Sequence, residues 1–404
     1  MEILFWLCLF IVFYAFAGYG LLLFALVKLK RIFKGKPAVP AINEATLPTC
    51  SLVIAAYNEE GFIIEKIKNT LQLHYPAGKL ELIFVTDGSS DRTPELVAAY
   101  PQIRLLHSPV RSGKIAAVHR AMDTVTTEVV VFTDANTYLN PDALLNICRH
   151  YADARVGAVA GEKRVQVEDT ADATAGEGFY WKYESKLKAW DSELHSVVGA
   201  AGELFSIRKS LYQPVSPKAI LDDFMISLLV AGKGYRVIYE PEAYASETSS
   251  ANVKEELKRK IRIAAGGIQS IVWLKSLLNP FPQPLLSFQY ISHRVLRWTV
   301  VPFLMILALI LNAAIVFRGD APAVYQVLLA AQVVFYTAAL AGWLLERREI
   351  KVKALFIPYY FLMMNYAVIR GIFRYFAGTQ SAAWDKAQRK QDRANGNAST
   401  VTLN

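Results

Sequence analysis

The sequence has few residues of the kinds that build disulfide frameworks or histidine metal sites. Its 404 residues include only 3 cysteines and 6 histidines. The cysteines form no CxxC pair and no HExxH motif occurs, so neither a disulfide framework nor a zinc site is predicted. Charged residues make up only 20% and hydrophobic residues 53%, which excludes a disordered chain. The 22 glycines and 17 prolines are too few for a collagen.

Two glycine-rich phosphate loops are also absent. No GxGxxG or GxxxxGK[ST] motif occurs. The sequence therefore lacks the phosphate-binding loop expected of a dinucleotide oxidoreductase or a P-loop ATPase. The net charge of +9 would suit nucleic-acid binding only if the basic residues clustered on a soluble surface. They instead follow apolar runs, at Lys28, Lys30, Arg31, Lys34, Lys36, Arg347, Arg348, Lys351 and Lys353. This positive-inside pattern predicts a lipid bilayer as partner, and no nucleic acid.

Long apolar runs predict membrane-spanning helices at both ends of the chain. Residues 3–27 form an uncharged run of 25 residues, about 37 Å as a helix against a hydrocarbon core of about 30 Å. Basic residues follow this run, which favours an uncleaved anchor with its N-terminus outside. Residues 295–317 and 324–345 predict a hairpin, and 354–369 is a further candidate, broken by Pro358.

Two regions near the C-terminal half allow more than one interpretation. If residues 354–369 crossed the membrane, the basic tail would lie outside, so the topology of residues 354–404 stays open; that tail contains Lys386, Arg389, Lys390 and Arg393. Residues 254–290 mix Lys-Arg clusters with apolar runs too short to span. We expect interfacial helices there, with ordinary soluble amphipathic helices as the alternative.

Between the apolar ends, residues 51–166 alternate between apolar runs and helical patterns. The apolar runs are 51–57, 80–86, 103–107 and 129–132. Helical patterns follow at 59–73, after Asp91 with Pro94 in the first turn, at 114–125 and at 141–151. Fully apolar strands separated by helices predict buried parallel strands. The fold class is therefore α/β, with a doubly wound sheet.

Polar side chains follow three of these four strands directly. They are Asn58, Glu59 and Glu60 after the first, Asp87 and Asp91 after the second, and Asp134 and Asn136 after the fourth. Ligands of open α/β sheets bind beyond the carboxyl ends of the strands. One such residue would be a cap or turn residue, but three strand ends with carboxylates, and Lys114 at a helix start, predict a ligand site. A carboxylate near the phosphate position implies a metal ion that bridges to a diphosphate, as in a nucleotide-sugar enzyme.

These segments resemble the family 2 glycosyltransferases of the GT-A fold, over about residues 48–265. The resemblance is carried by Ile54-Ala-Ala-Tyr-Asn-Glu-Glu60, Thr86-Asp-Gly-Ser-Ser-Asp91, Gly113-Lys114, Thr133-Asp-Ala-Asn136 and Leu221-Asp-Asp223. The membrane layout is similar to the branch of hyaluronan, chitin, cellulose and poly-N-acetylglucosamine synthases. The resemblance implies a Rossmann-like, nucleotide-sugar-binding cytosolic domain combined with transmembrane and interfacial helices.

The resemblance also implies roles for the matched residues. The donor-binding residues would be Tyr57, Glu59, Asp87, Asp91, Lys114, Asp134, Arg259 and Arg262. Asp134 and Asn136 stand where the family has its DxD metal motif, with an amide in place of the second acid. An amide carbonyl is still a hard oxygen ligand, so Mg²⁺ or Mn²⁺ remains the expected cofactor, with weaker affinity.

Asp222 and Asp223 allow two interpretations. An acidic pair at a helix start fits an N-cap that interacts with the helix dipole. The resemblance instead implies a catalytic role for the pair, with Asp223 as the general base and Asp222 beside it. The acceptor hydroxyl would lose its proton as it attacks the anomeric carbon, and the metal ion would stabilise the departing diphosphate. One displacement inverts the anomeric centre, so no Ser-His-Asp set is needed.

Two segments concern the acceptor. Gly199-Ala-Ala-Gly202-Glu203-Leu-Phe205 resembles the family's acceptor loop, in which small residues let a sugar or lipid approach the backbone; Gly202, Glu203 and Phe205 are the candidates. The alternative is a glycine-rich turn into a strand. Residues 259–263 depart from the Gln-x-x-Arg-Trp motif of processive synthases, because only Arg262 is retained. The missing tryptophan, replaced by Ile263, puts processivity in doubt, although Trp273 or Trp384 could substitute.

The expected protein is a membrane-bound inverting glycosyltransferase that uses a nucleotide-diphosphate sugar, with UDP as the expected nucleotide. The acceptor would be a growing polysaccharide or a lipid-linked glycan; a single-addition lipid glycosyltransferase and an inactive nucleotide-sugar-binding protein are the alternatives. We expect the bacterial inner membrane, with the catalytic domain in the cytosol. The expected domains are an anchor (1–36), a GT-A domain (48–250), interfacial helices (251–292), transmembrane helices (293–376) and a basic tail (377–404).

Overall fold

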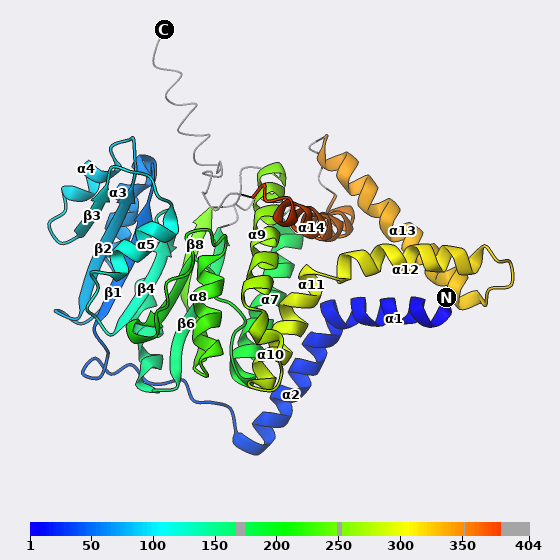
Figure 1. Ribbon diagram of the computed structural model, residues 1–404, viewed down its shortest axis with the longest axis horizontal. Coiled ribbons are helices and arrows are strands. Elements are labelled where there is room, and N and C mark those ends of the chain that lie inside the picture. The colour runs from blue at the N-terminus through cyan, green and yellow to red at the C-terminus, as the bar shows by residue number, and fades with distance from the viewer. Residues whose placement is uncertain (167–173, 249–252, 349, 351, 381–404) are drawn as a thin grey trace, which may run out of the picture.

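The computed structural model describes residues 1–166, 174–248, 253–348, 350 and 352–380. A sheet with its covering helices lies at one end of the molecule, and long apolar helices extend from the other (Figure 1). Helices α7 (Thr174–Leu194) and α9 (Val253–Trp273) lie between these two parts. The chain therefore passes from an apolar helix into the sheet domain and back to apolar helices.

In the described residues, eight strands form one sheet in the order β3-β2-β1-β4-β7-β6-β8-β5. Their bounds are β1 Cys50–Ala56, β2 Leu80–Asp87, β3 Arg104–Ser108, β4 Val129–Asp134, β5 Tyr138–Leu139, β6 Val156–Gln166, β7 Leu204–Arg208 and β8 Arg236–Thr248. The strands β3, β2, β1 and β4 are parallel, which confirms the predicted α/β class. The other half is mixed, because β7 runs antiparallel to both β4 and β6.

The helices between the parallel strands begin and end close to the predicted positions. They are α3 (Glu60–Leu71), α4 (Thr93–Ala98), α5 (Lys114–Met122) and α6 (Ala143–Cys148). The carboxylate of Asp91 accepts the backbone N–H groups of Glu60 at 3.0 Å and Thr93 at 3.0 Å. It thereby satisfies donors in the first turns of both α3 and α4, which otherwise have no partner within the helix.

The central parallel strands β1 and β4 are almost entirely apolar because both of their faces are buried. In β1, Leu52 and Ile54 belong to the core on one face, whereas Val53 belongs to the core on the other. Successive side chains of a strand point to opposite faces, so a strand that is buried on both faces must be apolar at every position. Polar residues are then confined to the strand ends.

Three helices of the described chain are long and apolar enough to cross a membrane: Glu2–Lys34, α13 (Ala323–Glu346) and α14 (Lys353–Phe376). The first consists of α1 (Glu2–Phe13), a π-helical turn (Tyr14–Gly18) and α2 (Tyr19–Lys34). A fourth results if the bent pair Pro284–Trp298 and α12 (Val301–Val316) is one span. Figure 1 shows α1 and α12 side by side.

The apolar run at 295–317 is not one straight helix. It contains the end of the segment Pro284–Trp298, a bend of 60°, and α12. Pro302 lies in the first turn of α12, where it has no N–H to bond to the Trp298 carbonyl, so the preceding helix ends there. By contrast, Pro358 lies inside α14, which continues as one helix to Phe376.

Residues 253–290 pack against the rest of the protein along part of their length. The middle of α9 is buried and packs along α14. A Cβ placed on Gly371 would lie 2.5 Å from the Cβ of Ala264, so the two helix backbones approach closely. Helix α10 (Pro284–Tyr290) follows a 3₁₀ turn. Trp384 and the basic residues Lys386, Arg389, Lys390 and Arg393 lie outside the described residues.

Candidate active site

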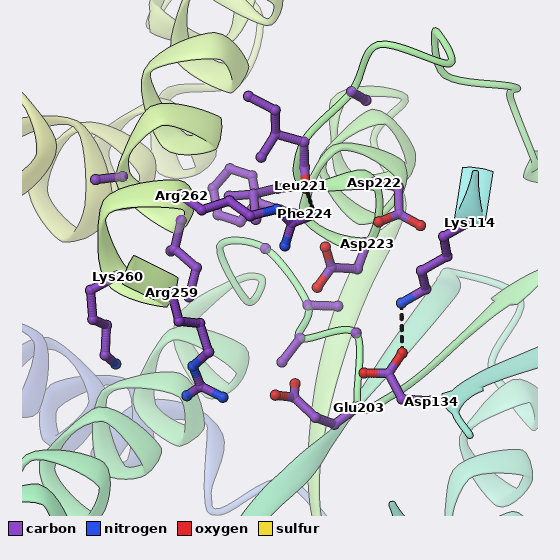
Figure 2. Close-up of a pocket in the computed structure, with 18 of the residues that line it drawn as sticks. Lys114, Asp134, Glu203, Leu221, Asp222, Asp223, Phe224, Arg259, Lys260 and Arg262 are labelled. Carbon is purple, nitrogen blue, oxygen red and sulfur yellow. Dashed lines mark hydrogen bonds and ion pairs between the residues drawn. The ribbon is translucent and has the colours of Figure 1, made fainter. Parts of the chain in front are cut away.

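A cavity of about 520 Å³ lies between the strand ends and the helices α7, α9 and α14 (Figure 2). We call one side of it the strand-end wall, which consists of Lys114, Asp134, Gly202, Glu203, Asp222 and Asp223. We call the other side the helix wall, which consists of Glu184, Lys188, Arg259, Arg262, Ile263, Ala264, Arg294, Trp298, Met364, Ala367 and Val368. The chemically reactive groups predicted from the sequence lie mainly on the strand-end wall.

Lys114 and Asp134 form an ion pair on the strand-end wall. Lys114 is the first residue of α5, and its Nζ donates to Asp134 Oδ1 at 2.6 Å. The preceding turn is held by buried Asp87, whose Oδ2 accepts the backbone N–H groups of Ser112 at 2.9 Å and Gly113 at 2.6 Å. Burial alone would lower the pKa of Lys114, but the nearby carboxylates, Asp134 first, outweigh it and raise that pKa. Lys114 is therefore a fixed cation at the strand ends.

Asp222 and Asp223 begin α8 (Asp222–Gly232) and lie beside this ion pair (Figure 2). The pKa of the partly buried Asp223 is raised to about 7, first by desolvation and then by the like charge of Asp222, while Lys114 opposes the shift. A Cβ on Gly202 would lie 3.1 Å from Asp223 Oδ2 and 3.4 Å from Lys114 Nζ. The absence of a side chain at Gly202 thus leaves room for the carboxyl of Asp223.

Glu203 belongs to a chain of alternating charges. It accepts from Lys163 Nζ, which also pairs with Glu247. Arg259 Nη1 lies 3.2 Å from the same Glu247 carboxylate, and Arg259 Nε lies 3.4 Å from Glu256. Burial alone would raise the pKa of Glu203, but Lys163 outweighs it and lowers that pKa. Glu203 is therefore held as an anion by its neighbours.

The predicted metal ligands lie at the end of β4. Asp134 and buried Asn136 flank a second, smaller hollow. Among the described residues, no group of three or more His, Cys, Asp or Glu side chains could hold a metal ion by itself. Mg²⁺ commonly binds through one or two carboxylates and completes its shell with phosphate oxygens and water. One carboxylate and one amide oxygen therefore fit an ion that binds together with a diphosphate.

The predicted nucleoside residues divide into two groups. Tyr57, Glu59 and Asp87 line the smaller hollow together with Arg111. The Arg111 guanidinium lies over the face of the Tyr57 ring, 3.8 Å from its centroid. Asp91 does not line this hollow; its carboxylate binds the backbone of α3 and α4 instead.

The predicted acceptor residues do not all lie at the large cavity. Gly202 and Glu203 line the large cavity, whereas Phe205 does not. Phe205 is buried in β7, where its ring stacks on Phe132 at a centroid distance of 4.8 Å. Arg262 lines the cavity and donates to the Ile220 carbonyl at 3.3 Å.

Several lining residues were not predicted from the sequence. Lys163 and Glu247 follow the apolar parts of β6 and β8, so recognition of these strands would have identified them. The aromatic residues at the cavity are Phe224 and Trp298, whereas Trp273 is 41% exposed and does not line it. No local motif marks Trp298 or the other unpredicted members of the helix wall, Glu184, Lys188, Arg294, Met364, Ala367 and Val368.

The architecture is that of a GT-A glycosyltransferase. It resembles the structure of the mannosyltransferase PcManGT from Pyrobaculum calidifontis in complex with GDP-Man and Mn²⁺, with a TM-score of 0.67 and 24% sequence identity. The similarity covers 92% of this chain and 99% of that chain. Residues 51–215 match the family model described as Glycosyl transferase family 2. This part of the chain is therefore similar to a family 2 glycosyltransferase domain.

Curated relatives include enzymes that are named for two kinds of product. The beta-monoglucosyldiacylglycerol synthase of Trichormus variabilis is 30% identical over 170 residues, which cover 40% of this chain and 35% of that protein. The poly-beta-1,6-N-acetyl-D-glucosamine synthase of Staphylococcus aureus is 25% identical over 277 residues, which cover 66% of each protein. The chain thus spans about a third of the length of the first relative and just under two thirds of the second.

Proposed function

We propose that this protein is a membrane-bound inverting glycosyltransferase that transfers a sugar from a nucleotide-diphosphate sugar to a glycan or lipid-linked acceptor. The observation that carries the proposal is Asp223, whose pKa of about 7 suits a general base. It lies in the same cavity as the Lys114–Asp134 ion pair. A proton acceptor and a fixed cation on one wall are the two protein groups that this transfer needs.

The reaction would proceed in one displacement. The nucleoside would lie against Tyr57, Glu59 and Asp87, and the diphosphate near Lys114, with UDP as the expected nucleotide. The acceptor hydroxyl oxygen would attack the anomeric carbon from the side opposite the diphosphate, while Asp223 takes the hydroxyl proton. The bond between the anomeric carbon and the diphosphate oxygen breaks, its electron pair leaves with the nucleoside diphosphate, and the anomeric configuration inverts.

The proposal includes a divalent cation. Asp134 and Asn136 would hold Mg²⁺ or Mn²⁺ together with the diphosphate. When bound, the ion supplies positive charge that stabilises the departing diphosphate. The structure of PcManGT contains Mn²⁺ together with GDP-Man, which supports this part of the proposal. Lys114 contributes its own charge to the same phosphate oxygens, because its side chain lies beside Asp134.

The proposed location is the inner membrane of a bacterium, with residues 48–250 in the cytosol. Three described helices could span the bilayer, and the first of them ends in a basic segment that contains Lys30, Arg31 and Lys34. Arg31 pairs with Glu193 of α7 at 2.6 Å, and Lys30 donates to the Glu193 carbonyl at 2.5 Å. The basic end of the first span therefore also fixes it to the catalytic domain.

The test is sugar transfer in membranes that contain the full-length protein. Radiolabelled UDP-glucose, UDP-N-acetylglucosamine and GDP-mannose are each supplied with Mg²⁺ or Mn²⁺, and products are sorted by organic extraction and by size. Asp223→Asn should lower transfer about 10²- to 10⁴-fold, the usual contribution of a general base. Asp123→Asn, an exposed position at the end of α5, is the matched control.

Each outcome has a definite meaning. Full transfer by Asp223→Asn would refute the assigned base, and undiminished transfer in excess chelator would refute the metal requirement. Asp223-dependent label in long water-soluble chains would indicate a processive synthase, whereas one-sugar products in the organic phase would indicate single addition to a lipid. Binding of nucleotide sugar without transfer to any acceptor would favour an inactive binding protein.

A further inference from the structure

The helix wall contains a buried cation that is not neutralised by the described chain. Lys188 lies on α7, lines the cavity and is only 5% exposed. Within the described residues it forms no hydrogen bond or ion pair; its ammonium lies 5.9 Å from the centroid of the Tyr239 ring. This contact provides a weak attraction. A buried charge without an opposite charge is costly, and a bound anion would remove that cost.

Two acidic residues lie within one turn of Lys188 on α7, Asp191 and Glu184, and both already have other partners. The buried carboxylate of Asp191 lies 2.6 Å from His293 Nδ1 and accepts from Gln289 Nε2 at 2.9 Å. Glu184 lies one helical turn before Lys188, so both side chains are on the same face of α7. The Glu184 carboxylate lies 2.6 Å from Arg294, 3.2 Å from His293 and 3.5 Å from Arg297. Burial alone would raise the pKa of Glu184, but Arg294 and His293 outweigh it and lower that pKa. Since Glu184 is matched by three basic side chains, it does not neutralise Lys188.

An apolar surface completes the same side of the cavity. Met364, Ala367 and Val368 line it from one face of α14, at the spacing of neighbouring helical turns. None of these side chains offers a hydrogen bond to a sugar hydroxyl, and a buried hydroxyl without a partner loses free energy. Helix α14 is itself apolar enough to cross a membrane. The ligand that contacts this surface must therefore be apolar there and able to come from the bilayer.

We propose that the acceptor is a lipid that carries a phosphate group between its apolar chain and the hydroxyl that receives the sugar. The hydroxyl lies at Asp223, the phosphate contacts Lys188, and the apolar chain extends along α14. This inference rests on the proposed function and specifies its acceptor. A nucleotide sugar does not explain the helix wall, because it has no apolar chain and its diphosphate is bound at Lys114.

The proposal is tested by acceptor preference in phosphatidylcholine vesicles that contain the full-length protein and the nucleotide-sugar panel. Two acceptors carry both a hydroxyl and a phosphate, namely phosphatidylglycerol and a polyprenyl-diphosphate-linked sugar. Diacylglycerol carries the hydroxyl and the chains without the phosphate, and a soluble oligosaccharide carries neither chain nor phosphate. The quantity compared is kcat/KM for each acceptor at saturating donor. We expect transfer to at least one phosphate-bearing lipid to exceed transfer to diacylglycerol and to the oligosaccharide.

Lys188→Gln then tests the residue. Loss of one partner of a close charge pair should lower the preference for the phosphate-bearing lipid over diacylglycerol by about 30-fold. Lys188→Arg should retain the preference, and Lys186→Gln, at an exposed position on the same helix, is the matched control. A purely structural role of Lys188 would lower both activities equally. The ratio therefore distinguishes binding of the phosphate from a general loss of folding.

Three results would overturn the inference. One is transfer that favours diacylglycerol or the oligosaccharide over both phosphate-bearing lipids. The second is an unchanged acceptor ratio in Lys188→Gln, and the third is equal loss with all acceptors in both Lys188→Gln and Lys188→Arg. Failure of the proposed function gives a different result, namely no Asp223-dependent transfer from any donor to any acceptor.

Discussion

The two walls of the cavity differ in how the chain forms them. Most residues of the strand-end wall end a strand or begin a helix, as Asp134, Lys114 and Asp223 do. Parallel strands bring their carboxyl ends to one edge, so these polar groups meet wherever the sheet forms. The helix wall combines α7, α9 and α14 with the bend at Trp298. Its composition depends on packing between distant segments. We therefore expect substitutions on the two walls to affect the proposed donor and acceptor separately.

Among the substitutions that compare the two walls and leave the proposed base in place, the largest effect is expected from Lys114→Met, which removes the fixed cation of the strand-end wall. Asp134 would lose its partner at 2.6 Å, and the adjacent carboxylates of Asp222 and Asp223 would repel the diphosphate. Loss of one member of such a pair predicts a fall in kcat/KM for the donor of about 30-fold or more. Steady-state transfer kinetics measure this change.

The matched control is Lys68→Met, which removes a cation from an exposed ion pair with Glu65. A surface ion pair contributes about 0–1 kcal/mol, so activity should stay near that of the unmodified protein. If Lys114→Met raised the acceptor KM and left the donor KM unchanged, Lys114 would belong functionally to the other wall, and the comparison between the walls would fail.

A smaller effect is expected from Gly202→Ala. The added Cβ would lie 3.1 Å from Asp223 Oδ2, closer than an ordinary van der Waals contact, and 3.4 Å from Lys114 Nζ. Displacement of a reacting group by a fraction of an ångström lowers the rate strongly, and we expect kcat to fall about tenfold. Gly61→Ala in α3, where a Cβ meets nothing within 4 Å, is the control. Equal activities of the two variants would show that the carboxyl of Asp223 does not need this space.

The sequence predicts the strand-end wall better than it predicts the helix wall. The parallel strands and the polar residues after them were predicted because burial on both faces leaves a continuous apolar run. Asp91 shows the limit of this inference, since its carboxylate binds two helix starts and does not line the nucleoside hollow. Phe205 likewise lies in the core although its segment matches the acceptor loop. A motif fixes position along the chain, whereas the orientation of a side chain depends on packing.

The helix wall could not be predicted because its residues have no local signal. Met364 and Val368 have the spacing of any apolar helix, and Lys188 is an ordinary charge of an amphipathic pattern. The bend that brings Trp298 to the cavity precedes Pro302, within a run that the sequence presents as continuous. Only the tertiary structure shows that these residues surround one cavity.

A substitution at the contact between α9 and α14 should affect the helix wall and leave the strand-end wall unchanged. Gly371→Val would place side-chain atoms against Ala264, whose Cβ lies 2.5 Å from an ideal Cβ at Gly371. Overpacking of this kind costs about 1–3 kcal/mol, so α14 should move away from α9. We expect the acceptor KM to rise several-fold with little change in donor binding by calorimetry. Tyr366→Val, on the exposed face of α14, is the control; equal effects on donor and acceptor would contradict separable walls.

The smallest change in maximal rate, and the sharpest test of the strand-end wall, is expected from Asp222→Asn. A general base must be deprotonated to act, so transfer at saturating donor should fall as the pH drops through the Asp223 pKa of about 7. The charge of Asp222 raises this pKa, as does Glu203 more weakly, whereas Lys114 lowers it. Replacement of Asp222 by the neutral amide should therefore move the acidic limb of the pH–rate profile to lower pH. At high pH the rate should change only a few-fold, because Asp223 is ionised in both proteins. If the limb stayed in place, the titrating group would be one other than Asp223, and proton transfer would have to be assigned to a different residue of the cavity.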